Sequence, residues 1–312
     1  MATRLSILKA STFSYVQRRG DALAVLVALL VGCSTISAAA AQNGGSGQSP
    51  TGPQQSGADP AALNYNGLDY TRPQQNANLR LQFRTSSAPT TQTERELLYL
   101  RLTTKIDLPA DWKLGLLGQA AFVGKETTST APPSTAPPST AREAGLGDSV
   151  FQAALLHTFD AHWAYGFGAR LVSPTAEDSL GNGKWEVMPG FGVRYSFLEI
   201  NRETYFVPVL RWAVSFAGDP SRRNINEPQI APTLNIALPE RWFVTFYPSN
   251  DIRINYGDPV AGQTGRLFLP FDAAIGRNIT DRVTAYLEMS VPMISNYPVY
   301  KFKTELRISV KF

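Results

Sequence analysis

The segment that decides the fold is the last one, residues 300–312, which reads YKFKTELRISVKF. Its apolar set is Tyr300, Phe302, Leu306, Ile308, Val310 and Phe312, and its polar set is Lys301, Lys303, Glu305, Arg307, Ser309 and Lys311. Because successive side chains on a β-strand point to opposite faces, this spacing predicts a strand with one apolar face and one charged face.

The same period of two recurs along the chain from residue 77 onward, without a convincing helical stretch. We count about twelve such segments, most of them longer than the five or six residues typical of a soluble sheet and close to the ~9–11 of a tilted membrane strand. Their ranges are 77–84, 96–107, 112–123, 148–159, 163–172, 185–197, 204–216, 226–237, 242–255, 266–275, 282–290 and 299–312.

The connections between these segments alternate in length. The short ones are 108–111, 160–162, 238–241 and 276–281, with 198–203 somewhat longer, and three of them place Trp112, Trp163 or Trp242 at the start of the next strand. The longer, more polar ones are 85–95, 124–147, 173–184, 217–225 and 256–265. Short turns, long loops and a belt of tryptophans are typical of an outer-membrane barrel. A soluble sandwich would need an improbably wide dry core, so the sequence predicts an all-β, transmembrane, antiparallel up-and-down barrel of about twelve strands.

Composition excludes several classes of function. Charged residues make up only 17% of the chain, against about 25% in a typical soluble protein. The first 41 residues hold four basic residues and one acidic one, so the rest of the chain is nearly neutral and the net charge of +4 does not indicate nucleic-acid binding. One cysteine and two histidines exclude a disulfide framework and a multi-cysteine metal site. We therefore expect no cofactor and no metal.

The first 41 residues are typical of an export signal. A basic stretch precedes the apolar run 22–31 and the small residues up to Ala41, which predicts cleavage after Ala41. Leu30-Val31-Gly32-Cys33 also resembles a lipobox, so lipidation at Cys33 is the alternative. Residues 42–76 are rich in Gly, Gln, Ser and Pro and predict a disordered periplasmic leader. The barrel is predicted over 77–312, in the cell outer membrane.

Two resemblances sharpen this prediction. Phe312 at the end of an alternating strand resembles the C-terminal signature of Gram-negative outer-membrane barrels, which implies recognition by the barrel-assembly machinery. Gly145-Leu146-Gly147-Asp148, Pro174-Thr175, Leu180-Gly181-Asn182-Gly183-Lys184 and Pro189-Gly190 resemble motifs of the outer-membrane family called MetA-pathway of phenol degradation. Membership of that family implies a barrel that passes small hydrophobic or aromatic compounds.

The charged face of the strands supplies the candidate site. We predict that the pore is lined by Arg101, Arg170, Arg194, Arg211, Glu186, Glu227, Asp272 and Glu288. Other residues expected to face inward are Arg80, Lys113, Asp251, Arg253, Arg282, Lys303, Glu305 and Arg307. Two interpretations remain open: a structural network of ion pairs that fills the barrel, or a constriction with a basic bias that favours anions or polarised aromatic solutes.

The function predicted from these features is a passive channel for small solutes, with outer-membrane lipids as its surroundings. A non-conducting barrel with a structural or surface role is the alternative. An outer-membrane lipid hydrolase is disfavoured, because His157 and His162 lie near a predicted periplasmic turn without a nucleophile partner. The repeat APPSTAPPST within loop 127–141 predicts a partner-binding tract, a glycosylated loop or a tolerated insertion.

Overall fold

The computed structural model of the chain describes residues 66–129, 139–177, 179–249 and 251–312. The predicted signal segment with Cys33, residues 42–65 of the predicted leader and residues 130–138 of the proline-rich loop lie outside the described residues. The described regular structure is β, apart from one short 3-10 turn at Pro239–Arg241. Within the described ranges, no helix is long and apolar enough to cross a membrane.

The described strands form a single antiparallel sheet. They are β1 (Asn76–Ala88), β2 (Thr91–Asp107), β3 (Trp112–Ser129), β4 (Thr140–Leu146), β5 (Ser149–Thr158), β6 (Trp163–Ser173), β7 (Lys184–Ser196), β8 (Tyr205–Gly218), β9 (Asn226–Ala237), β10 (Trp242–Phe246), β11 (Ile252–Ile254), β12 (Leu267–Asn278), β13 (Val283–Ser295) and β14 (Phe302–Lys311).

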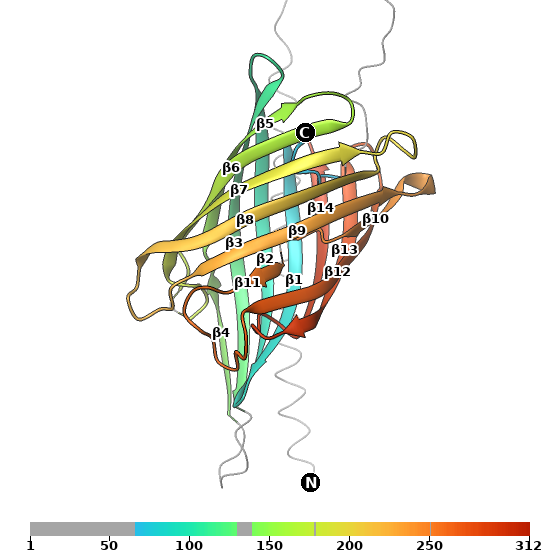
Figure 1. The fold of residues 1–312 in the computed structure, drawn as a ribbon. Helices are drawn as coiled ribbons and strands as arrows, with labels where there is room; N and C mark the ends of the chain where they lie inside the picture. The colour runs from blue at the N-terminus through green and yellow to red at the C-terminus, as the bar shows by residue number, and fades with distance from the viewer. Residues whose placement is uncertain (1–65, 130–138, 178, 250) are drawn as a thin grey trace, which may run out of the picture. The chain divides into compact units, whose positions relative to one another are not determined.

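The sheet closes into a barrel because its first and last strands pair. β1 runs antiparallel to β14 from the pair Asn76 and Lys311 to the pair Thr85 and Phe302. β4 and β5 both pair with β3, and β10 and β11 both lie between β9 and β12, so each of these two couples fills one position in the barrel. The strands thus occupy twelve positions, which confirms the predicted architecture. Figure 1 shows β5 to β9 crossing the front at a steep tilt, with β1 to β3 behind them.

Two predicted loops are wrong in extent, because strands continue into them. β1 and β2 meet at a two-residue turn, residues 89 and 90, in place of the predicted loop 85–95. β3 and β4 pair as a hairpin through the predicted loop 124–147, on both sides of residues 130–138. Both extensions are polar and contain several threonines, which favour strands. Hydropathy misses them because the strand segments beyond the apolar band carry no apolar face.

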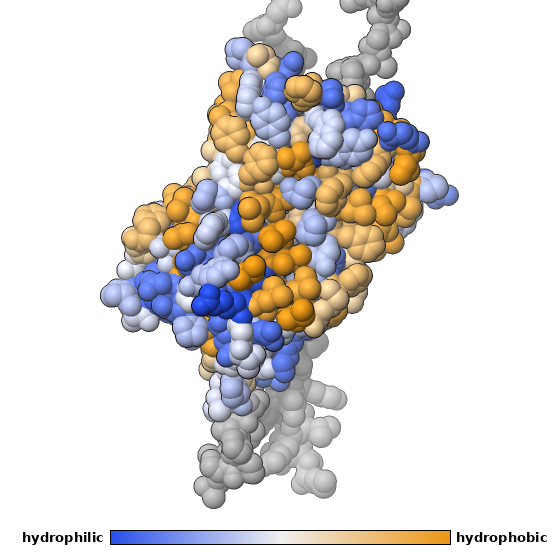
Figure 2. All heavy atoms as spheres, viewed as in Figure 1, coloured by the Kyte–Doolittle hydropathy of each residue, from blue (hydrophilic) through white to orange (hydrophobic). Residues whose placement is uncertain are grey.

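The apolar face of the barrel points outward. Along β9 every second residue is buried, and this buried set is mostly polar: Glu227, Gln229, Ala231, Thr233 and Asn235. Large apolar side chains on the outer face are 42–56% exposed, among them Leu100, Phe151, Phe191, Leu210 and Leu306. Figure 2 shows apolar residues over much of the visible wall, with hydrophilic residues gathered toward the loops. This arrangement suits a wall surrounded by lipid.

The three predicted tryptophan turns share one structure. In each turn a backbone N–H donates to the carbonyl oxygen of the tryptophan that opens the next strand, at 2.8 Å, 3.0 Å and 2.8 Å. The pairs are Leu108 with Trp112, Phe159 with Trp163, and Leu238 with Trp242. These turns lie at the barrel end that also carries Asn76 and Lys311, which we call the turn end; the opposite end, with the longer connections, is the loop end.

Candidate functional site in the barrel interior

The residues just before β1 lie inside the barrel. The side-chain amide of Asn66 donates to the side-chain oxygen of Asn235 at 2.7 Å, and its own oxygen accepts from the Tyr205 hydroxyl at 3.0 Å. Leu68 is 2% exposed and packs against interior side chains of β10, β12 and β13. We call residues 66–75 the inner segment.

Residues 66–76 differ from the predicted disordered leader 42–76, because their side chains contact the interior of the barrel; residues 42–65 lie outside the described residues. Composition suggested disorder because the segment has few apolar residues to bury. Its polar side chains instead find partners on the polar inner face of the barrel, which a composition argument does not count. Asn76 is already the first residue of β1.

Asp69 is the main electrostatic anchor of the inner segment. Its carboxylate lies 3.2 Å from the guanidinium of Arg194 on β7 and 3.4 Å from that of Arg72, and it accepts hydrogen bonds from the backbone and hydroxyl of Thr71. Burial raises the pKa of Asp69, and the neighbouring Arg72 opposes that rise. The two guanidiniums therefore supply the positive charge that a buried carboxylate requires.

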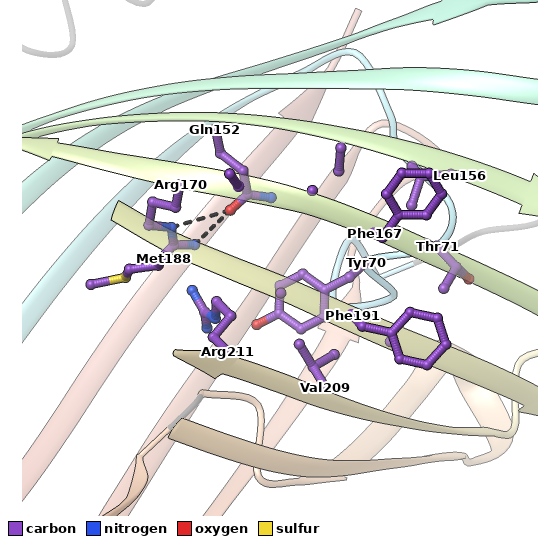
Figure 3. Close-up of a pocket in the computed structure, with 16 residues that line it drawn as sticks. Tyr70, Thr71, Gln152, Leu156, Phe167, Arg170, Met188, Phe191, Val209 and Arg211 are labelled. Atoms are coloured by element: carbon purple, nitrogen blue, oxygen red, sulfur yellow. Dashed lines mark hydrogen bonds between the residues drawn. The ribbon is translucent and has the colours of Figure 1, made fainter. Parts of the chain in front are cut away.

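Tyr70 of the inner segment reaches across the interior. Its hydroxyl donates to the backbone oxygen of Pro248, beyond the end of β10, at 3.1 Å. Its ring lines a cavity of about 70 Å³ together with Gln152, Arg170 and Arg211. Figure 3 shows the ring projecting into this cavity, with the two arginines on one side of it.

One side of the interior is a dense network of ion pairs, which we call the paired wall; it covers β9 to β14 and β1. Lys303 is 2% exposed at its side chain and ion-pairs with Asp251, with Glu288 and, at 3.6 Å, with Asp272. Oxygens of these three carboxylates lie within 4.8 Å of one another, a spacing that suits a metal ion. The Lys303 ammonium lies among them and supplies one positive charge, and the guanidinium of Arg253 lies 3.1 Å from Asp251.

Two further carboxylates complete the paired wall. Glu305 accepts two hydrogen bonds from Arg80, at 2.8 Å and 2.6 Å, and forms an ion pair with Arg307 at 2.9 Å. Glu227 accepts from Arg223 and from the hydroxyl of Tyr297, both at 2.5 Å. The buried carboxylates of this wall therefore have cationic partners on neighbouring strands or loops, as low polarity demands.

The opposite side of the interior, on β2 to β6, carries arginines held by amides. Arg101 donates through Nε and Nη2 to Oε1 of Gln119, at 2.9 Å and 2.6 Å. Arg170 donates in the same way to Oε1 of Gln152, at 3.1 Å and 2.9 Å. We call these four side chains the donor row. Within the described ranges, neither arginine lies within ion-pair distance of a carboxylate.

Next to the donor row the inner wall carries four glycines on inward positions of β6 and β7. Gly166 pairs with Gly192, and Gly168 pairs with Gly190; we call them the glycine patch. Gly166 and Gly192 are buried against the side chains of Leu156 and Val209, whereas Gly168 and Gly190 are partly exposed. A Cβ atom on Gly190 would come within 2.6 Å of the Arg211 side chain, which places that arginine beside the patch. The glycine patch forms part of the cavity wall that Tyr70 faces.

The structure places the eight predicted pore residues on inward positions but in separate groups. Asp272 and Glu288 belong to the Lys303 cluster, and Glu227 to its neighbour in the paired wall. Arg194 holds Asp69, and Glu186 accepts from Asn182 at 2.8 Å. Arg101, Arg170 and Arg211 are only partly buried and lie on the β2 to β8 side. Their role in lining a pore remains a proposal.

The predicted side-chain direction is wrong for two residues. Arg282, expected inside, is exposed, because it lies in the turn before β13 and not on the strand. Tyr300, expected on the apolar outer face, is 2% exposed inside the barrel, where its ring contacts Phe268 and its hydroxyl lies 2.7 Å from Ser290. It precedes β14, so the strand alternation does not govern it.

Sequence reasoning missed Asp69 and Tyr70 as interior residues and the glycine patch as a surface. Asn66, Asp69 and Tyr70 were the available signal, since such residues are unusual in a Gly/Ser/Gln/Pro linker. The histidines serve aromatic packing: His157 stacks on Trp112 with ring centroids 4.8 Å apart, and His162 stacks on Tyr195 at 5.6 Å.

The chain is similar to known proteins in a family match and in fold. The model of the family described as MetA-pathway of phenol degradation matches residues 72–247. An outer membrane channel from Pseudomonas putida F1 is similar in structure, with a TM-score of 0.59 and 16% identity over 78% of this chain and 98% of that one. The NanC porin and the KdgM porin show weaker likeness, with TM-scores of 0.44 and 0.41, identities of 12% and 10%, 76% of this chain covered in both cases, and 98% and 99% of their own chains covered. No curated protein matches the chain in sequence.

The family match covers more than half of the chain, and the Pseudomonas channel has the same fold. The structural match agrees with the closed barrel. The chain therefore belongs to the MetA-pathway of phenol degradation family and has the fold of an outer-membrane β-barrel.

Proposed function

We propose that this barrel is a passive channel that carries small solutes across the outer membrane. The observation that carries the proposal is the asymmetry of the interior: the paired wall is closed by ion pairs, whereas the β2 to β8 side keeps partly accessible arginines, glutamines and bare backbone. Passage of a solute along that side requires no cofactor and no catalysed reaction.

The glycine patch supports a path for flat, apolar molecules such as small aromatic compounds. The pair Gly168 and Gly190 leaves partly exposed backbone without side chains, and Met188 borders it at the pair with Arg170. The inner segment narrows this path, because Tyr70 stands in it.

Planar-bilayer conductance of the full chain, expressed and purified from outer membranes, tests the proposal. We expect discrete steps that recur across preparations and vanish when the barrel is unfolded by heat. Heat-modifiable electrophoretic mobility verifies in parallel that the barrel is folded. Folded barrels that never conduct, and that do not let small sugars swell liposomes, would contradict a passive channel.

A non-conducting barrel is the second candidate, and one observation favours it. The inner segment occupies the interior near the turn end through Asn66, Leu68 and Asp69. If it closes the path permanently, the conductance experiment gives no steps with the native chain. A variant with a released inner segment would then conduct, and the two candidates would be told apart.

A further inference from the structure

We propose that the donor row binds the carboxylate of a small organic anion whose flat apolar body lies on the glycine patch. This inference rests on the proposed channel and specifies its solute class. Arg170 is the main contact in this proposal because it belongs both to the donor row and to the cavity wall.

The first argument is charge compensation. A guanidinium inside a barrel requires a partner of opposite charge or full hydration. In the paired wall Lys303 and Arg80 each meet a carboxylate, whereas Arg84, which is also on β1, donates to the amide oxygen of Gln82. Within the described residues, Arg101 and Arg170 meet only the neutral amide oxygen of a glutamine. An anionic solute would supply the missing charge.

The second argument concerns the kind of hydrogen bond on offer. The amide oxygens of Gln119 and Gln152 are both occupied by arginine N–H groups. What the donor row still presents is therefore N–H groups: the remaining guanidinium hydrogens and the amide nitrogens of the two glutamines. A surface of donors with a positive charge favours carboxylates, and Arg binds them strongly through two parallel hydrogen bonds.

The third argument is the strand register, which places the row at one level. Arg101 is the cross-strand partner of Gln119, and Gln152 is the partner of Arg170. Gln119 pairs with Val150, two residues from Gln152 on the same face. The four side chains therefore form one continuous band across β2, β3, β5 and β6.

The fourth argument is the space beside this band. The pair Gly168 and Gly190 follows directly on the pair Arg170 and Met188 along the same face. A carboxylate held by Arg170 would thus place its body over bare backbone. The cavity measures about 70 Å³, less than the ~150 Å³ of an engineered cavity that admits benzene. The Tyr70 ring must therefore move aside when the body of the solute enters.

The test uses the full chain from outer membranes and three probes: benzoate, the neutral isostere benzamide, and acetate. Benzoate should reduce the ion current at concentrations at least about tenfold lower than benzamide, since a charge-assisted bond is worth that factor. Acetate, which has the charge but no flat body, should fall between them. Arg170→Gln and Arg101→Gln should each weaken the benzoate effect by about tenfold.

Arg282→Gln is the matched control, because it removes the same charge from an exposed turn. Tyr70→Ala should strengthen the benzoate effect by clearing the cavity. Equal action of benzoate and benzamide on a conducting channel, or identical benzoate block in Arg170→Gln and Arg282→Gln, would overturn the donor-row site and leave the channel intact.

Ligand-observed NMR of benzoate with the detergent-solubilised barrel separates this inference from the channel itself. Binding that is lost in Arg170→Gln but kept in Arg282→Gln would support the site even in a barrel that does not conduct. Absence of binding by a folded barrel would contradict the site whatever the conductance.

Discussion

The two sides of the barrel interior both carry inward-facing cations, but these cations have different partners. On the paired wall Lys303 ion-pairs with three carboxylates, and Glu305 binds two arginines. On the donor row Arg101 and Arg170 bind only glutamine amides. The neighbours across the sheet therefore decide whether an inward charge is held in an ion pair or can bind a solute. The alternation of residues along one strand does not distinguish these two cases.

The largest expected effect is on the paired wall. Lys303→Met removes a cation from among three carboxylates that are almost fully buried. Leaving buried charges unpaired should destabilise the barrel by about 3–5 kcal/mol. Unfolding in urea, followed by heat-modifiable mobility, measures this loss. Lys301→Met, at an exposed position two residues away, is the control and should unfold like the native chain.

The second-largest effect is expected in the inner segment, which lies between the two walls. Asp69→Ala removes the ion pairs to Arg194 and Arg72, so the segment should open more often. In a chain with Leu68→Cys and Cys33→Ser, maleimide labelling at position 68 should accelerate by on the order of tenfold.

The matched control is Asp107→Ala in the same background, since Asp107 is exposed at the end of β2. Equal labelling rates in the two variants would mean that Asp69 does not anchor the segment. Conductance should also rise in Asp69→Ala if the segment narrows the path.

Substitutions in the donor row should change the ion selectivity of the channel with little change in the stability of the barrel. Replacing Arg101 and Arg170 together by Gln removes two cations that have no carboxylate partner in the described residues, so the unfolding free energy should shift by less than about 1 kcal/mol. The reversal potential in a KCl gradient should move toward cation selectivity. A loss of stability comparable to that of Lys303→Met would show that the two walls are alike after all.

The smallest effect is expected outside both walls. The backbone N–H of Ser129 donates to the carbonyl of Ser139 at 2.9 Å, so the two strands of the β3–β4 hairpin are already adjacent there. Replacing residues 130–138 by Asn-Gly, a favoured two-residue turn, should change the unfolding free energy by less than about 0.5 kcal/mol. A barrel that no longer assembles would give the proline-rich tract a structural role.

Much of the fold could be predicted from local pattern. The period of two located the strands, as in 226–237 for β9 and 112–123 for most of β3, and the turn residues before Trp112, Trp163 and Trp242 marked one end. The extension of β1 to Ala88 and the interior position of Tyr300 could not be predicted, because hydrophobic alternation stops where the lipid-facing band stops.

The sequence by itself determined that the chain is a barrel with its apolar face outward, because alternation is a property of one strand at a time. It also predicted the inward position of strand charges such as Arg170 and Glu288, but not the exposed position of Arg282 in the turn before β13. Only the tertiary structure decided that β1 pairs with β14, that residues 66–75 lie inside, and that Lys303 meets carboxylates while Arg101 and Arg170 do not. The physical reason is that ion pairs and the closure of the barrel bring together residues that are far apart in the chain. Their contacts depend on the register between strands, which no single segment of the sequence encodes.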